Sequence, residues 1–175
     1  MPELIAPTSR LHRQWLAARD DWGRGVHQDG SGLRPGDEVD TADGFAAWIR
    51  GLLRQSDPAV EPEPDWVHCT YWWVVEGDEV LGSIALRHEL TDALLSWGGH
   101  IGYGVRPAAR GRGLARFAVA QVLAYAKQLG LDRVLITCRE SNRASRQVIE
   151  KSGGVLEDVR VSEEGPIRRY WAVTG

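Results

Sequence analysis

The chain has 175 residues, a length at which one domain buries a sizeable core without disulfides or a structural metal. Hydrophobic residues make up 43% and charged residues 26%, which excludes a disordered, collagen-like or coiled-coil protein. No apolar run approaches the roughly 18 residues of a membrane-spanning helix, and the N-terminus lacks the basic and apolar regions of a secretion signal. We therefore expect one soluble, cytoplasmic domain over residues 1–175, with no membrane partner. Cys69 and Cys138 lie in separate apolar runs, which indicates buried, reduced thiols without metal-ligand spacing.

The net charge of −3 conceals a separation of charge along the chain. Residues 105–151 hold ten Lys and Arg against three Asp and Glu, whereas the rest of the chain is acidic. A basic segment inside an acidic protein suits a phosphorylated small molecule better than a nucleic-acid backbone, so no nucleic-acid partner is expected. A solvated helix face is the alternative interpretation of the same arginines.

Helical periodicity dominates the first 65 residues, after a short apolar start. Thr8 and Thr41 precede the two periodic stretches and are suited to be their N-caps. Segments rich in Gly, Asp, Pro and Glu separate them and predict surface loops. The predicted strand covers residues 3–6, the helices 8–24 and 41–55, and the loops 23–40 and 56–65.

From residue 66 the pattern changes to that of strands, with Gly77-Asp78 as a tight hairpin turn. A long helix then ends at Gly130, and a shorter one ends at Gly153-Gly154. The predicted strands cover residues 67–76, 79–90, 99–105, 133–138, 154–161 and 166–173, and the helices cover 113–130 and 142–152.

This order of elements predicts an α/β fold, a single mixed sheet flanked by helices, with a βαβ crossover around residues 100–138. In open α/β sheets, ligands bind beyond the carboxyl ends of strands and at helix N-termini. The crossover is therefore where we expect the functional site.

Residues 102–116 run from the end of a strand into the first turn of the long helix. Gly111 and Gly113 allow the backbone to approach a ligand closely, and the helix N-terminus contributes about half a positive charge. Arg110 and Arg112 add charged hydrogen-bond donors. Together these features suit a pyrophosphate.

Two well-known phosphate loops do not match this segment. A Walker loop needs Gly-Lys-Ser/Thr, whereas this loop continues as Gly113-Leu114-Ala115. A dinucleotide fingerprint needs a third glycine where Arg116 stands, and an acid at the end of the next strand, whereas Asp132 precedes that strand.

The loop Arg110-Gly-Arg-Gly-Leu-Ala115 matches the Arg/Gln-x-x-Gly-x-Gly/Ala pattern of the GCN5-related N-acetyltransferases (GNAT), the family that this chain resembles. The resemblance covers about residues 100–160, because Asn142-Arg-Ala-Ser145 and the ending Glu-Lys-Ser-Gly-Gly are similar to the family's second helix. It implies the GNAT-like acyl-CoA N-acyltransferase fold, with a mostly antiparallel sheet, and an acetyl-CoA-dependent N-acetyltransferase.

The resemblance also implies where acetyl-CoA lies as co-substrate. Two central strands would splay apart, with backbone groups of one strand on the pantetheine arm and loop amides on the pyrophosphate. Gly102 and Gly104 flank Tyr103, which suits a bulge or a close backbone approach within a strand. Close packing at Gly102 and N-capping by Asn142 are the alternative interpretations of those two residues. The cofactor-binding residues implied are Tyr103, Gly104, Val105, Arg110, Gly111, Arg112, Gly113, Leu114, Ala115, Asn142 and Ser145.

Transfer to an amine needs a base, a stabilised oxyanion and a proton for the leaving thiolate. Glu89, His88 and His100 are candidate bases, with a solvated strand end or a structural histidine as the alternatives. Many family members carry a tyrosine as general acid at the position of Ile149, which puts the acid in doubt here. Tyr103, Tyr170 or solvent would have to replace it.

The acceptor side is expected in residues 8–75 and 155–175, which are acidic and rich in tryptophan. Carboxylates and aromatic faces suit a small cationic amine attacking the thioester directly in a ternary complex. A protein lysine or N-terminal acyltransferase, and a non-catalytic acyl-CoA sensor, are the alternatives. The last strand, Pro166–Val173, presents a predicted free edge that favours a homodimer.

Overall fold

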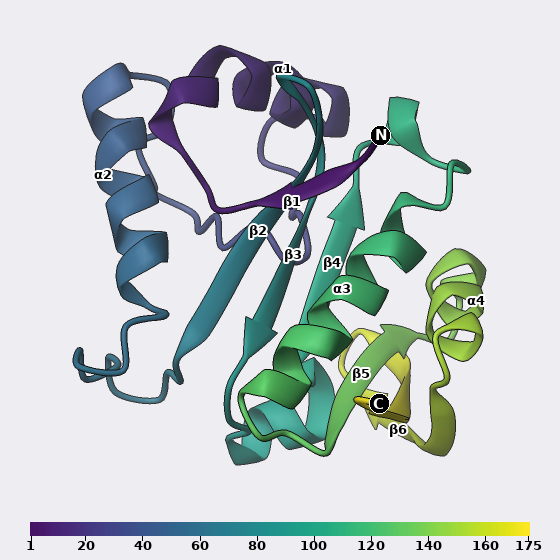
Figure 1. Cartoon of the computed structure of the whole chain (residues 1–175). Coiled ribbons are helices and arrows are strands. Elements are labelled where there is room, and N and C mark those ends of the chain that lie inside the picture. The colour runs from purple at the N-terminus through teal and green to yellow at the C-terminus, as the bar shows by residue number, and fades with distance from the viewer.

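The computed structural model describes residues 1–175 and contains one seven-stranded sheet in the order β1-β2-β3-β4-β5-β7-β6 (Figure 1). Only the β4–β5 pair is parallel, so the expected mixed, mostly antiparallel sheet flanked by helices is confirmed. None of the helices combines the length and apolar character needed to cross a bilayer. The strands are β1 (Glu3–Ile5), β2 (Cys69–Glu76), β3 (Glu79–Arg87), β4 (Ile101–Val105), β5 (Arg133–Arg139), β6 (Val155–Ser162) and β7 (Gly165–Val173); the helices are α1 (His12–Trp22), α2 (Ala42–Arg54), α3 (Leu114–Gln128) and α4 (Arg143–Lys151).

Each face of the sheet is covered by a different pair of helices, because successive side chains of a strand point to opposite faces. Helices α3 and α4 cover one face, where Ile84, Val119 and Ile136 belong to the larger apolar core. Helices α1 and α2 cover the other face, where aromatic residues such as Phe45 and Trp73 form a second core. Helices from the N-terminal part of the chain thus cover one face of the sheet, and the two later helices cover the other face.

The predicted helix starts are confirmed by their caps. The Thr8 side chain accepts a hydrogen bond from the Arg10 amide at 3.3 Å, and Thr41 accepts one from the Gly44 amide at 3.1 Å. Thr8 caps a 3₁₀ turn, Ser9–Leu11, that leads into α1. Both predicted cysteine thiols are free and buried, as expected.

The predicted strand 79–90 is too long, because β3 ends at Arg87. The His88 amide still donates to the His68 carbonyl at 2.8 Å, but the strand does not continue beyond this contact. The connection then forms a π-helical turn at Leu94–Gly98, an element that the sequence analysis did not predict.

Arg169 on β7 holds this connection in place although it is only 1% exposed. Its Nε donates to the Leu95 carbonyl at 2.9 Å, and its Nη1 pairs with Glu157 at 2.5 Å and Asp158 at 2.7 Å. The guanidinium lowers the pKa of Asp158. One buried arginine therefore joins the π-helical turn, β6 and β7.

The predicted free edge at Pro166–Val173 is wrong. Strand β7 pairs with β5 along one side and with β6 along the other, because the last hairpin folds β6 outward. The free edges of the sheet are β1 and β6, so pairing of two copies through β7 is blocked by strands already in place.

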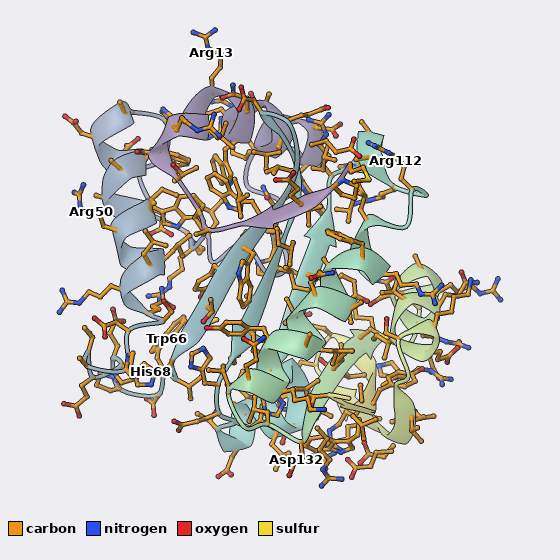
Figure 2. The ribbon with its side chains drawn as sticks, viewed as in Figure 1. Arg13, Arg50, Trp66, His68, Arg112 and Asp132 are labelled. Carbon is orange, nitrogen blue, oxygen red and sulfur yellow. The ribbon has the colours of Figure 1, made fainter.

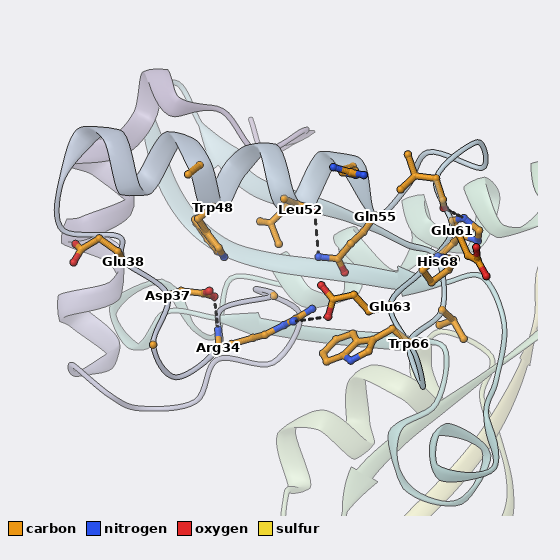
Figure 3. A pocket seen from close by; sticks show the side chains of 18 of the residues that line it. Arg34, Asp37, Glu38, Trp48, Leu52, Gln55, Glu61, Glu63, Trp66 and His68 are labelled. Atoms are coloured by element: carbon orange, nitrogen blue, oxygen red, sulfur yellow. Dashed lines mark hydrogen bonds and ion pairs between the residues drawn. The ribbon is translucent and has the colours of Figure 1, made fainter.

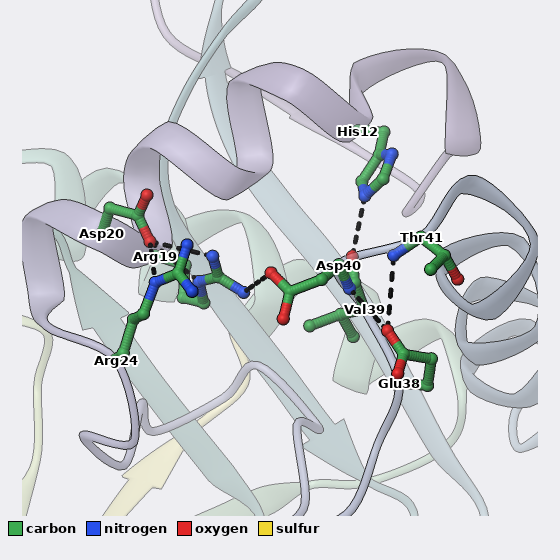
Figure 4. A network of polar contacts seen from close by, with 8 residues as sticks. All are labelled: His12, Arg19, Asp20, Arg24, Glu38, Val39, Asp40 and Thr41. Carbon is green, nitrogen blue, oxygen red and sulfur yellow. Dashed lines mark hydrogen bonds and ion pairs between the residues drawn. The ribbon is translucent and has the colours of Figure 1, made fainter.

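A polar network fixes the end of the long loop between α1 and α2 (Figure 4). The buried Arg19 pairs with Asp20 at 2.9 Å and with Asp40 at 2.7 Å, and it lowers the pKa of Asp40. His12 Nε2 donates to the Val39 carbonyl at 2.7 Å, and Glu38 accepts from the Asp40 amide. The loop is thus bound to α1 just before α2 begins.

Replacing Arg169 tests how much the buried ion pairs contribute. We expect Arg169→Met to lower the free energy of unfolding by about 2 kcal/mol, because a buried pair is broken while both carboxylates still reach solvent. Since the pKa of Asp158 is lowered in the fold, the stabilisation is present at neutral pH and is lost as pH falls below about 4. Urea unfolding at pH 7 and pH 3.5 measures both effects.

Arg139→Met, which breaks an exposed pair with Glu164, is the matched control and should change stability by less than about 0.5 kcal/mol. Equal losses in both variants would contradict a special role for Arg169.

Candidate functional site

The site is built where β4 and β5 diverge. Pairing between them is confined to Ile101 and Ile136, so the two parallel strands separate toward their carboxyl ends (Figure 1). The Arg87 amide donates to the His100 carbonyl, and the Arg106 amide donates to the Leu81 carbonyl. Because backbone groups alternate along a strand, those of the residues at 103 and 105 face β5 instead.

Two of the predicted pantetheine-binding residues, Tyr103 and Val105, therefore direct backbone groups into the region where β5 has moved away. The Val105 carbonyl accepts a hydrogen bond from Arg110 Nε at 3.1 Å. Gly104 directs its backbone toward β3, where it pairs with Ser83. An extended, amide-containing chain fits beside Tyr103 and Val105 as an added strand would.

The loop before α3 presents unpaired amides to the same region. Gly113 is the N-cap of α3 with φ 77°, and no side chain caps the helix. The amides of Leu114, Ala115 and the following residue have no carbonyl partner in the helix. Gly111 and Gly113 both have positive φ, and a Cβ built on either meets nothing within 4 Å. The loop thus fits a diphosphate at the positive end of the helix.

The predicted phosphate-binding arginines already have partners in this structure. Arg110 lies 5.0 Å from the ring centroid of Trp22. Arg112, at the turn before α3 (Figure 2), pairs with Glu76 at 2.5 Å and lowers the pKa of that carboxyl. Exposed ion pairs are weak, so a diphosphate can compete with Glu76 for Arg112.

Helix α4 and strand β4 each contribute one hydroxyl to a pair at the splay. Asn142 accepts a hydrogen bond from the Ser145 amide at 3.0 Å, so it is the N-cap of α4. The hydroxyls of Tyr103 and Ser145 are 2.8 Å apart, and burial raises the pKa of Tyr103. Ile149, at the position where the resemblance implies a tyrosine in many family members, is fully buried in the larger core.

Gly102 and Gly104 permit a close approach, but by the chain's own loop. A Cβ on Gly30 would lie 2.3 Å from the Gly102 carbonyl oxygen, and a Cβ on Gly104 would lie 3.1 Å from the Asp29 carbonyl oxygen. The loop after α1 therefore rests directly on β4, on the face opposite α3.

This contact brings in two residues that the sequence analysis missed. Asp29 accepts a hydrogen bond from His27 Nε2 at 3.0 Å, and both side chains are exposed, while the Asp29 backbone carbonyl lies against β4. The Gly102 and Gly104 spacing indicated a close neighbour but not its identity, so no sequence signal could have found this pair.

The candidate base His100 is buried between the diverging strands. Its Nδ1 accepts a hydrogen bond from the Leu135 amide at 2.8 Å, and its own amide donates to the Leu135 carbonyl at 2.7 Å. Burial, reinforced by the positive charge of Arg87, lowers the pKa of His100 to about 4. His88 contacts Thr70 instead, at 2.8 Å.

Glu89 is exposed on the bend that follows β3. Since β3 is antiparallel to β4, this bend lies beside the start of β4, at the end of the strand away from Arg110. The structure therefore does not bring Glu89 together with the predicted cofactor loop.

The fold and the site together define an acyl-CoA-binding protein: a parallel strand pair that splays beside an uncapped helix N-terminus. Comparison with family models gives a match to the acetyltransferase (GNAT) domain over residues 34–155. The match covers more than half of the sequence, so the chain belongs to the GNAT acetyltransferase family. It is an acetyl-CoA-dependent N-acetyltransferase, as the resemblance predicted.

Solved structures support the fold over nearly the whole chain. RimL, a ribosomal L7/L12 alpha-N-protein acetyltransferase in complex with coenzyme A, is similar with a TM-score of 0.71 and 15% identity, covering 98% of this chain and 93% of that one. The ribosomal-protein-S5-alanine acetyltransferase of Vibrio fischeri has a TM-score of 0.75 and 15% identity, covering 99% and 93%. A chimera of spermidine N-acetyltransferase SpeG from Vibrio cholerae and hSSAT has a TM-score of 0.65 and 16% identity, covering 99% and 95%. A sequence search of curated proteins finds no match.

The diphosphate fit predicts the effect of a negative charge at the start of α3. Gly113→Glu should weaken acetyl-CoA binding at least about tenfold, or about 1.4 kcal/mol, because its carboxylate repels the diphosphate. Gly130→Glu is the matched control at the other end of α3, because Gly130 also has positive φ and an open Cβ position. Isothermal titration with acetyl-CoA measures both, and equal weakening would contradict the assignment.

The burial of His100 predicts a pH effect on stability. Because its pKa is lowered in the fold, the neutral ring is favoured, and stability is lost as pH falls from 6.5 toward 4, by up to about 1.4 kcal/mol per pH unit. His100→Gln should remove this part of the slope in urea unfolding. A ring that titrates near 6.5 by NMR would contradict the prediction.

Proposed function

We propose that this acetyltransferase acts on a small cationic amine, which attacks the thioester directly in a ternary complex. The observation that carries the proposal is the acidic loop after α1, whose Asp29 lies against β4 on the face opposite α3. Acetyl-CoA would occupy the α3 and α4 side of the splay, and the amine would approach from the loop side. A carboxylate on that side attracts an ammonium group.

Direct transfer is favoured because the chain offers no activated thiol. Burial raises the pKa of Cys69 to about 11, and it also raises the pKa of Cys138. A thiol needs to ionise before it can accept an acetyl group, so neither residue is suited to carry one. The amine itself is then the nucleophile.

We propose that the His27–Asp29 pair is the general base, which accepts the proton that the amine loses. When His27 Nε2 donates to Asp29, its Nδ1 is left as an acceptor, the arrangement that a general base needs. His100 has its Nδ1 occupied by the Leu135 amide, so its proposed role is to join β4 to β5.

We propose that the hydroxyl pair of Tyr103 and Ser145 is the general acid, which donates a proton to the leaving thiolate. The pair lies at the splay, between β4 and α4, where Ile149 cannot donate a proton. As the new bond forms between the amine nitrogen and the acetyl carbon, the carbon–sulfur bond breaks and its electrons remain on sulfur. A proton passed along the two hydroxyls would neutralise that sulfur.

A protein N-terminus is the second candidate acceptor. RimL and the S5-alanine enzyme are named for ribosomal-protein acceptors, whereas SpeG is named for spermidine. Thiol release from acetyl-CoA, followed with a thiol-reactive dye, separates these classes when polyamines, amino acids, aminoglycosides and N-terminal peptides are supplied in turn. Release that depends only on peptides would overturn the small-amine proposal.

The proposed base predicts a difference between two carboxylates. Asp29→Asn should lower kcat/KM for the best amine by about 100-fold, because the His27 ring loses the negative charge of its partner, whereas Glu89→Gln should leave it nearly unchanged. The reverse order of the two variants would return the role to Glu89.

A further inference from the structure

A cavity of about 650 Å³ lies away from the acetyl-transfer site, between α2 and two loops (Figure 3). Residues 32–38 form one wall and residues 60–68 another, and α2 covers them. Tyr71 of β2 lies on the cavity side of the sheet. Strand β3 lies between it and β4, because Tyr71 pairs with Ala85 and Ala85 pairs with Gly102. This cavity, called the groove below, is thus a second concave site, and the proposed acetyl transfer does not use it.

The helix wall of the groove is open at its centre. Gly51 lies within α2 and lines the cavity, and a Cβ built there meets nothing within 4 Å. Glycine inside a helix weakens the helix, and no packing in this structure requires it. The lack of a side chain keeps space for another molecule beside Leu52 and Gln55.

Trp48, also on α2, places an unpaired donor in this wall. The side chain points from the helix toward the groove (Figure 3), and the residue is only 8% exposed. Its Nε1 has no hydrogen-bond partner. Since buried donors are nearly always paired, an acceptor atom from a ligand would complete this site.

The opposite wall already holds a cation from the chain itself. The guanidinium of Arg34 lies 3.6 Å from the ring centroid of Trp66, and it is 3.6 Å from Glu63 (Figure 3). An aromatic face beside a carboxylate is the environment that a guanidinium prefers. Because Trp66 and Glu63 are exposed, their hold on Arg34 is weak enough to be displaced.

The net negative charge of the cavity lining favours the binding of a cation in addition to Arg34. Four carboxylates face two arginines around the cavity, and Glu61 forms no ion pair or side-chain hydrogen bond in the structure. A cationic ligand would therefore enter an acidic groove that its own arginine only partly neutralises. The carboxylates are Asp37, Glu38, Glu61 and Glu63, and the arginines are Arg34 and Arg54.

We propose that this groove binds a ligand with a guanidinium group, which takes the place of Arg34 over Trp66 and beside Glu63. A hydrogen-bond acceptor of the same ligand faces Trp48. Arginine, free or within a peptide, carries both groups: its side chain supplies the cation, and its carboxylate or carbonyl supplies the acceptor.

The test follows the indole N–H signals of Trp48 and Trp66 by NMR, assigned with Trp48→Phe and Trp66→Phe, in protein without acetyl-CoA. L-arginine, N-acetyl-L-arginine amide and an arginine tripeptide are titrated separately, with citrulline as the neutral control. We expect saturable shifts with the guanidinium probes and none with citrulline. Preference for the free amino acid or for the tripeptide distinguishes the two sources of the ligand.

Three variants make the proposal falsifiable. Gly51→Leu fills the groove and should weaken binding at least about tenfold. Arg50→Leu is its control on the same helix, since Arg50 points away from the groove (Figure 2), and it should bind as the wild type does. Arg34→Ala removes the internal competitor, so it should bind the probe about threefold more tightly.

Absence of saturable shifts at millimolar arginine overturns the proposal, as does weaker binding by Arg34→Ala. Equal binding of citrulline would also overturn it, because the charge would then have no role. Thiol release by the same variants is measured separately, so a failure of the proposed acetyl-transfer assignment is distinguishable from a failure of this one.

Discussion

The whole site depends on the short pairing between two parallel strands. Each central strand is held on its outer side, β4 by β3 and β5 by β7, through long antiparallel ladders. Their contact with each other is limited to Ile101 and Ile136, so the backbone beyond that point has no strand partner. Unpaired backbone groups are costly when buried. An extended co-substrate lying beside Tyr103 and Val105 would supply the missing partners.

The base of the splay needs polar support as well. The Leu135 amide would lack an acceptor where the ladder stops, and the His100 ring supplies one through Nδ1. A charged ring would be unable to accept at that nitrogen, so burial and Arg87, which both lower the pKa of His100, preserve the bond. Arg169 likewise supplies a partner to a backbone group of the connection before β4, because it donates to the Leu95 carbonyl. Both residues fix geometry next to the site.

The cofactor side could be predicted because its signals are local. Gly111 and Gly113 need positive φ, and the helix that follows starts where the periodicity begins. The proposed acceptor side could not be predicted, because it rests on a contact between Gly30 and Gly102, which lie far apart in the sequence and share no short motif. The order of β6 and β7 was missed for a related reason. A hairpin pattern gives the pairing of two strands but not which of them joins β5.

Ion pairs in the fold join the basic segment of the sequence to the acidic segments. Arg112 pairs with Glu76, and Arg106 pairs with Asp21 and Glu79, so the basic crossover is tied to the acidic N-terminal half. These pairs join the cofactor loop to α1 and to the β2–β3 hairpin. A diphosphate at the start of α3 would draw Arg112 away from Glu76, and the acidic half would then carry one more free carboxylate.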